Sequence, residues 1–196
     1  KAMKYGWMWI IPLQSTTSYG YVFNDNFNVL EEFKKEINYN EKDLIKKINF
    51  PSGRYNVHAY ESNNKIYSAV GLSSAFIEPL ESTGIGLIVR NIYSLAKLID
   101  GKINIEEHNN SVNNDYDTMV PFILAHYKYN KIDNNYWKPL TKLKVKDRLP
   151  GTIFNELNWD LILSGMNQYK IPIIPPSIDN LKAISKGEKY KDWINL

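Results

Sequence analysis

The sequence predicts an α+β fold, with short strands in the first 70 residues and mainly helices after them. Two patterns predict this division. Near the N-terminus, aromatic and apolar residues alternate in the period-two pattern of half-buried strands. After Glu81, isoleucine and leucine recur at intervals of three and four residues, which is typical of an amphipathic helix.

The first elements are expected to be a pair of strands and a helix. Residues 5–11 form an extended segment whose odd-numbered side chains share one face. A polar turn at 14–18 leads to a partner strand at 20–23, and an apolar patch among Glu and Lys favours a helix over 28–37. Three further short strands are expected at residues 48–50, 55–60 and 65–70, separated by turns at 51–54 and 62–64.

The second half of the chain is expected to be helical. Gly71 ends the last strand, and the periodic helix over 85–99 ends at Asp100 and Gly101. A second helix is expected around 119–126, ahead of an aromatic stretch at 127–137. Breakers are expected at 149–151 and 172–176, and a surface helix over 179–196. No internal repeat or low-complexity linker indicates two independent domains.

Composition excludes several classes of protein. With 43% hydrophobic and 23% charged residues, the chain is typical of a globular protein. The net charge is only +3 and the lysines are interleaved with acidic residues, so we expect no nucleic-acid partner. No apolar run reaches the roughly 20 residues of a membrane span, so no membrane partner is expected either. The absence of cysteine rules out disulfides and thiolate zinc sites, and we expect a cytoplasmic protein.

The positions of the histidines predict no metal site. The three histidines, His58, His108 and His126, are far apart and lack metal-ligand spacing. We interpret each as a surface or core residue rather than a ligand or base.

The segment from Glu78 to Gly84 (Glu-Pro-Leu-Glu-Ser-Thr-Gly) opens the periodic helix. A helix N-terminus exposes backbone N–H groups and about half a positive charge. Ser82 or Thr83 can cap it, and Gly84 lets an anion approach the backbone. This chemistry suits a small anion or the electron-rich edge of a flavin. On sequence chemistry alone, a plain capped helix is the more common explanation of the same residues.

Three motifs together resemble those of the flavin-dependent tryptophan halogenases. Residues 71–85 read GLSSAFIEPLESTGI, and residues 6–12 read GWMWIIP, which matches the family's Gly-Trp-x-Trp-x-Ile-Pro. His126-Tyr127 and the stretch 133–137 (Asp-Asn-Asn-Tyr-Trp) are similar to the family's His-Tyr and Asp-Asp-x-Phe-Trp, with Asn134 as a departure. The resemblance covers most of residues 1–170, and it implies the C-terminal part of a FAD-dependent halogenase/monooxygenase-like fold.

The resemblance implies roles for residues of the first motif. Thr83 and Gly84 correspond to the family's halide site, through backbone and hydroxyl contacts. Glu81 corresponds to the glutamate beside the substrate and the reactive lysine. Leu72 and Ile85 correspond to positions where the family's backbone touches the flavin. Glu78 has no catalytic counterpart, and we interpret it as structural.

The aromatic residues have two readings. Trp7 and Trp9 match a tryptophan pair that is proposed to keep the substrate away from the flavin ring. Tyr136 and Trp137 match residues that close over an indole substrate. On chemistry alone, large aromatics on a strand or helix face are core residues.

The implied reaction uses reduced FAD from a separate flavin reductase, oxygen and a halide, either chloride or bromide. Its product is a halogenated electron-rich aromatic of the tryptophan or indole type. The family's Gly-x-Gly-x-x-Gly turn and catalytic lysine belong to an N-terminal half that this sequence lacks. We therefore expect residues 1–100 to end the substrate sheet and close over the flavin, and residues 101–196 to form a helical C-terminal region.

The missing half is thus an expected partner, and the resemblance is compatible with a homodimer. Alone, the chain is expected to be inactive, and to aggregate through open strand edges. Two alternatives remain: a non-catalytic fragment, and a flavin monooxygenase-like relative without halogenation.

Overall fold

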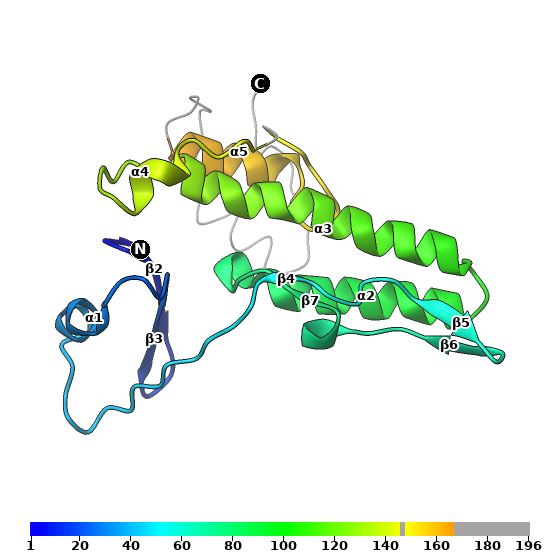
Figure 1. Cartoon of the computed structure of the whole chain (residues 1–196), viewed down its shortest axis with the longest axis horizontal. Helices are drawn as coiled ribbons and strands as arrows, with labels where there is room; N and C mark the ends of the chain where they lie inside the picture. Colours follow the sequence, from blue (N-terminus) through cyan, green and yellow to red (C-terminus); the bar gives the residue numbers. More distant parts are fainter. Residues whose placement is uncertain (146–147, 167–196) are drawn as a thin grey trace, which may run out of the picture. The chain divides into compact units, whose positions relative to one another are not determined.

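The computed structural model describes residues 1–145 and 148–166 of the chain, which contain both strands and helices, an α+β fold (Figure 1). The chain divides into two compact units, residues 1–159 and 160–196. The second unit contributes only the end of helix α5 (Glu156–Gly165) and Met166 to the described residues. The predicted breaker at 172–176 and the predicted helix over 179–196 lie outside the described residues.

The strands are short, and the longest helices come after them. The strands are β1 (Ala2–Met3), β2 (Gly6–Pro12), β3 (Thr17–Phe23), β4 (Gly53–Arg54), β5 (Tyr60–Ser62), β6 (Lys65–Tyr67) and β7 (Ala75–Phe76). The other helices of the first unit are α1 (Leu30–Glu36), α2 (Thr83–Ile99), α3 (Ile105–Lys128) and α4 (Trp137–Leu140), with single 3₁₀ turns η1 (Gly71–Ser73) and η2 (Leu80–Ser82).

Strands β1, β2 and β3 form an antiparallel sheet in that order. In β2, Trp9 pairs with Gly20 of β3, and its indole lies over that glycine. A Cβ at Gly20 would come within 1.8 Å of the ring, so glycine is required there. The buried residues of β2 are Gly6 and Met8, of which Met8 is 1% exposed, whereas Trp7 and Trp9 are half-buried. Neither tryptophan is therefore fully buried in the core.

The region between α1 and α2 differs most from the sequence prediction. Residues 48–50 form no strand, and Gly53–Arg54, predicted as part of a turn, is strand β4, which pairs with β7. Tyr55 and Asn56 both donate backbone N–H groups to the Ser74 carbonyl at 2.9 Å, so they follow a loop rather than a ladder. The β5–β6 hairpin was predicted correctly at its turn. Its turn residues Asn63 and Asn64 both have positive φ, as a type I′ turn requires.

Helix α2 confirms the predicted helix but not the face expected to be buried. It ends as predicted at Asp100 and Gly101, where the N–H of Lys102 bonds the carbonyl of Lys97 in a Schellman motif. Its buried residues are Thr83, Leu87, Asn91, Ser94 and Leu98. Of the isoleucines and leucines that predicted the helix, Ile85, Ile92 and Ile99 are 68%, 52% and 71% exposed. With Val89 they form an outward apolar stripe on α2.

Helix α3 lies beside α2 and closes the core of the first unit (Figure 1). Its N-terminus carries a capping box, in which the side chains of Asn104 and Glu107 each accept the other's backbone N–H at 2.8 Å. The core cluster takes residues from β7, α2 and α3: Ala75, Leu87, Val112, Tyr116, Met119 and Ile123.

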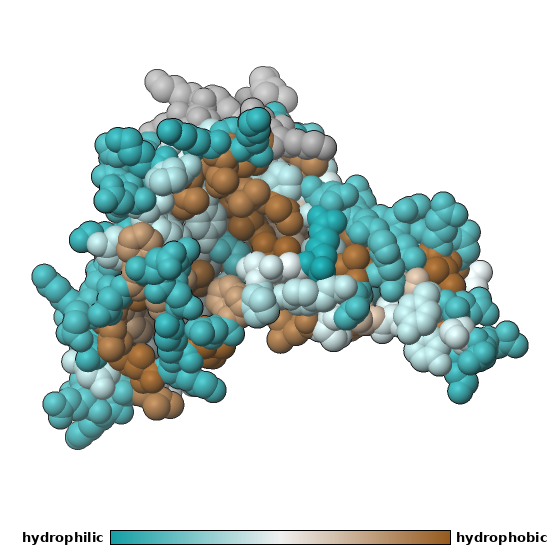
Figure 2. All heavy atoms as spheres, viewed as in Figure 1, coloured by the Kyte–Doolittle hydropathy of each residue, from teal (hydrophilic) through white to brown (hydrophobic). Residues whose placement is uncertain are grey.

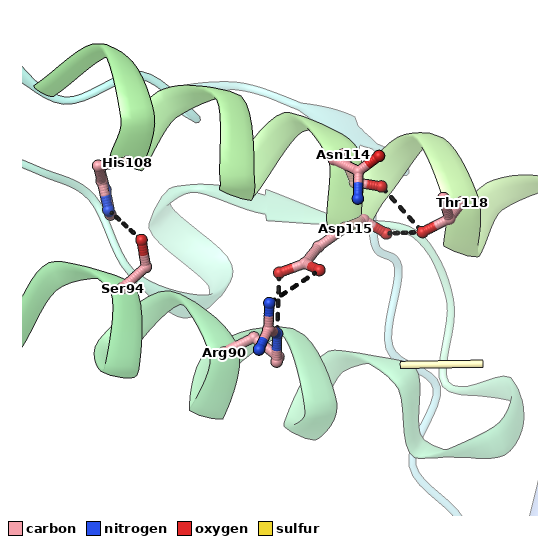
Figure 3. Close-up of polar contacts among 6 residues, drawn as sticks. All are labelled: Arg90, Ser94, His108, Asn114, Asp115 and Thr118. Atoms are coloured by element: carbon pink, nitrogen blue, oxygen red, sulfur yellow. Dashed lines mark hydrogen bonds and ion pairs between the residues drawn. The ribbon is translucent and has the colours of Figure 1, made fainter. Parts of the chain in front are cut away.

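Two polar pairs cross the α2–α3 interface (Figure 3). Ser94 Oγ lies 2.8 Å from Nδ1 of His108, which is fully buried. Arg90 donates to both carboxylate oxygens of Asp115, at 3.2 and 3.4 Å, and Asp115 is only 3% exposed. These pairs explain part of the polar character of the inward face of α2, because Arg90 and Ser94 each find a partner on α3.

Among the described residues, no helix has the length and apolar character needed to cross a membrane. Apolar side chains nevertheless reach the surface in several places on the face shown in Figure 2.

Replacing Leu87 by alanine should lower the free energy of unfolding by about 2–5 kcal/mol, because it opens a cavity in the core cluster. The matched change Val89→Ala, on the 60% exposed position two residues later, should cost less than about 0.5 kcal/mol. Urea unfolding of the two variants measures both values. Equal losses would contradict the assignment of the inward and outward faces.

Stability should fall below about pH 6.5, the ordinary pKa of histidine. Burial lowers the pKa of His108, so the folded protein holds this ring neutral while the unfolded chain binds a proton. This contribution is complete above pH 6.5 and declines as the pH falls toward the folded pKa, with a slope of at most about 1.4 kcal/mol per pH unit. Thermal unfolding at pH 7.5 and 5.5 measures it. His108→Gln should reduce the dependence but not remove it, because burial also lowers the pKa of His126. The control Gln14→Asn, at an exposed position without a titratable group, should leave it unchanged.

Candidate functional site

A pocket of about 930 Å³ lies between strand β2, the segment from η1 to η2 and the first turns of α2. This volume is in the range of small-molecule sites. The pocket brings together seven of the residues predicted from sequence to form a site: Trp7, Trp9, Leu72, Glu81, Thr83, Gly84 and Ile85. They come from two separate stretches of the chain, residues 7–9 and 72–85, so the fold and not local sequence unites them.

The turn into α2 is strained at the two residues that carry polar side chains toward the pocket. Glu81 and Ser82 have φ of 56° and 54°, the left-handed region that costs a non-glycine residue roughly 1–2 kcal/mol. Such strain is found where a surrounding structure fixes a functional group. The side chain of Glu81 is 52% exposed, so its carboxylate remains accessible.

Neither Ser82 nor Thr83 caps α2, contrary to the sequence-based expectation. Ser82 occupies the N-cap position without a side-chain bond, because its left-handed backbone departs from the extended conformation of a capping residue. Thr83 is 1% exposed, and its hydroxyl donates to the Glu78 carbonyl at 2.9 Å. Gly84 faces open space where a Cβ would lie. The backbone beside Gly84 is therefore the approachable part of this turn.

His126 lies next to Glu81, a neighbour that sequence reasoning missed. Nδ1 of His126 is 2.9 Å from the Phe122 carbonyl, so this nitrogen carries the proton. That bond leaves Nε2 facing Oε1 of Glu81 at 3.9 Å. Burial lowers the pKa of His126, and the ring is neutral at pH 7. The His-Tyr motif was the only signal in the sequence that pointed to this residue.

Tyr136 and Trp137 do not line the pocket. Trp137 is 2% exposed, and its indole N–H donates to the Met3 carbonyl at 2.7 Å. Tyr136 packs edge-on against Trp137 and against Phe27, with ring centroids 5.0 and 5.6 Å apart. In this structure the two residues connect α4 to β1 and the loop before α1.

The pocket has features that suit the isoalloxazine ring of a flavin. Its walls are largely apolar, with Leu72 and Ile85 71% and 68% exposed. Asn91 lines it, and the buried Oδ1 of Asn91 has no hydrogen-bond partner in the described structure. That oxygen is an acceptor for a ring N–H. The dinucleotide part of FAD finds no counterpart, because the sequence has no Gly-x-Gly-x-x-Gly turn.

The described residues contain no group of His, Cys, Asp and Glu side chains that could hold a metal ion.

Comparison with known proteins gives the family. The model of the tryptophan halogenase family matches residues 1–167. The chain belongs to the tryptophan halogenase family. Tryptophan 6-halogenase ThaL of Streptomyces albogriseolus and tryptophan 7-halogenase RebH of Lentzea aerocolonigenes are each 31% identical to it over 162 residues. These residues are 78% of this chain and 30% of each relative, so the chain spans about a third of their length.

Solved structures of tryptophan halogenases and related flavin-dependent halogenases share the fold. The tryptophan 6-halogenase SttH of Streptomyces toxytricini superposes with a TM-score of 0.70 at 27% identity, covering 93% of this chain and 42% of that one. BrvH, a flavin-dependent halogenase from Brevundimonas sp. BAL3, gives 0.69 at 26% identity, covering 94% and 43%.

Thr83→Val should lower the free energy of unfolding by about 1–3 kcal/mol, because the Glu78 carbonyl loses its donor in a buried position. The control Thr16→Val, in the exposed β2–β3 turn, should change it by less than about 0.5 kcal/mol. Urea unfolding measures both. A Thr83→Val protein as stable as the wild type would show that this hydroxyl does not hold the turn.

Proposed function

We propose that this chain is part of a flavin-dependent halogenase, acting on an electron-rich aromatic of the tryptophan or indole type. The observation that carries the proposal is the pocket, which collects residues of two separate halogenase motifs around one apolar cavity. Family membership over residues 1–167 supports it.

Leu72 and Ile85 would provide apolar contacts to the isoalloxazine ring of reduced FAD, and Asn91 an acceptor for its N–H. When bound, the flavin would react with oxygen and chloride or bromide to supply the electrophilic halogen. Trp7 and Trp9, with ring centroids 6.0 Å apart, would form the wall that separates the ring from the substrate. A separate flavin reductase would supply the reduced flavin.

The start of α2 would hold the halide. Its N-terminus is the positive end of a 17-residue helix, and the side of Gly84 is open. Because the Thr83 hydroxyl already donates to Glu78, the backbone at Thr83 and Gly84 would supply the contacts.

Glu81 would accept the proton that leaves the aromatic ring when the halogen adds. Its exposed carboxylate lines the pocket, and the left-handed turn fixes the direction of its side chain. Positioning one ring carbon between this carboxylate and the halogen donor would determine regioselectivity.

The outward stripe of α2 supports a further partner in the complete enzyme. Ile85, Val89, Ile92 and Ile99 are all more than half exposed, and apolar stripes of this kind are normally covered. The N-terminal dinucleotide-binding half, with its catalytic lysine, would cover the stripe and complete the flavin site. In this arrangement residues 1–100 would complete the substrate sheet and close over the flavin, residues 101–196 would form the helical C-terminal region, and the chain alone would be inactive.

Three other predictions concern the assembled enzyme. Tyr136 and Trp137 would contact the substrate, which requires α4 to take part in a site formed with the missing half. The homodimer and the cytoplasmic location also stay predictions.

The test is a halogenation assay of the native holoenzyme with FAD, a flavin reductase, oxygen, L-tryptophan and sodium chloride or bromide, with products identified by mass spectrometry. Glu81→Gln should lose about 10²–10⁴-fold in rate while still binding flavin. The matched control Glu61→Gln, in the exposed β5–β6 hairpin, should keep the wild-type rate.

An undiminished rate in Glu81→Gln would remove the assigned role of Glu81. A hydroxylated product in place of a halogenated one would identify the monooxygenase-like alternative. No flavin-dependent turnover would favour a non-catalytic fragment.

A further inference from the structure

Three side chains from distant parts of the sequence form one hydrogen-bonded chain beside the pocket. The indole Nε1 of Trp7 on β2 donates to the hydroxyl oxygen of Tyr127 on α3 at 3.1 Å. The Tyr127 hydroxyl donates in turn to Oε2 of Glu78, just before η2. Only Trp7, the outermost member, lines the pocket.

The donor and the acceptor of each of these two hydrogen bonds follow from the chemistry of the side chains. An indole N–H can only donate, so the Tyr127 oxygen must accept from Trp7 and give its own proton to Glu78. Burial raises the pKa of Tyr127, and the hydroxyl therefore stays protonated. Burial also raises the pKa of Glu78, which the hydrogen bond from Tyr127 opposes.

Glu78 is buried, which is unusual for a glutamate. It is 8% exposed, and its Oε1 is buried with no hydrogen-bond partner in the described structure. Burying a carboxyl group without saturating its bonds is unfavourable. A residue that only supported the fold would be served as well by an apolar side chain.

Glu78 also contacts a second element that lines the pocket. Its backbone carbonyl accepts the hydroxyl of Thr83, at the start of α2. One residue therefore bonds to the helix N-terminus and, through Tyr127, to Trp7.

We propose that Glu78 and Tyr127 are positioning residues that fix the plane of the Trp7 indole on the pocket wall. The consequence for catalysis rests on the proposed function. With its N–H anchored, the Trp7 ring keeps one orientation against Trp9 and closes the wall between flavin and substrate. Without the anchor the ring reorients, and oxidising equivalents are lost before they reach the substrate.

The first experiment follows the indole N–H signals of the ¹⁵N-labelled chain by NMR, with the Trp7 signal assigned from its disappearance in Trp7→Phe. Tyr127→Phe removes one oxygen atom and keeps the ring. It should shift the Trp7 N–H signal and speed its exchange with water on the order of tenfold, because the acceptor is lost. The signal of Trp159, a fully buried indole on α5, should not change.

Two matched variants separate positioning from general disturbance. Glu78→Gln retains an acceptor for Tyr127, so it should keep the wild-type Trp7 signal. Tyr19→Phe removes a hydroxyl from an exposed ring on β3 and should change nothing. A Trp7 signal unaffected by Tyr127→Phe would overturn the inference, whatever the catalytic result.

The second experiment measures halogenated product formed per reduced flavin consumed by the native holoenzyme. Tyr127→Phe should lower this ratio several-fold, whereas Glu78→Gln, which keeps an acceptor for Tyr127, should keep the wild-type value. An unchanged ratio in an active Tyr127→Phe enzyme would also overturn the inference.

A wild-type protein that makes no halogenated product would remove the proposed function, and the NMR result alone would then decide whether Tyr127 positions Trp7. If Tyr127→Phe fails to fold, the wild-type chain still provides a test. Its Trp7 indole N–H must be protected from exchange as the Trp137 N–H is, and exchange at the solvent rate would refute the proposal.

Discussion

The packing of α2 against α3 is the interaction on which the rest of the first unit depends. The core cluster is built from these two helices and β7, with Leu87 of α2 set among Val112, Tyr116 and Met119 of α3. α2 begins at the pocket, and α3 carries His126 and Tyr127 to its edge. The hydrogen bond from Trp7 to Tyr127 then connects the N-terminal sheet to the same helix pair. The α2–α3 pair thus supports both stretches of chain that form the pocket.

The turn between Glu78 and Thr83 contains unfavourable features that its hydrogen bonds offset. Two left-handed residues and a buried carboxyl group are all unfavourable by themselves. They persist because the turn is held at both ends, by Tyr127 on the Glu78 side chain and by Thr83 on its carbonyl. The result is a glutamate, Glu81, that lies on a fixed turn and keeps its carboxylate accessible.

Local patterns predicted the elements well, and long-range packing decided what they could not. The α2 helix and its glycine stop follow from spacing and backbone chemistry within the segment. Which face of α2 is buried depends on His108 and Asp115, which lie on another helix. The apolar stripe of α2 was therefore not a guide to the buried face. The prediction of a strand over 55–60 was wrong at its start, because the N–H groups of Tyr55 and Asn56 bond to the carbonyl of Ser74 rather than to a partner strand. The pocket residues could be named from motifs, whereas the buried bonds of Glu78 and the contact of His126 with Glu81 required the structure.

The polar pairs across the α2–α3 interface also fix how far one helix can slide along the other. Apolar side chains tolerate a shift of one turn, because one isoleucine or leucine replaces another at little cost. A one-turn slip of about 5.4 Å would instead separate Arg90 from Asp115 and leave a buried carboxylate without its partner. Ser94 would lose His108 in the same movement. The pairs therefore set the axial register of α2, and with it the depth at which Thr83 and Gly84 enter the pocket.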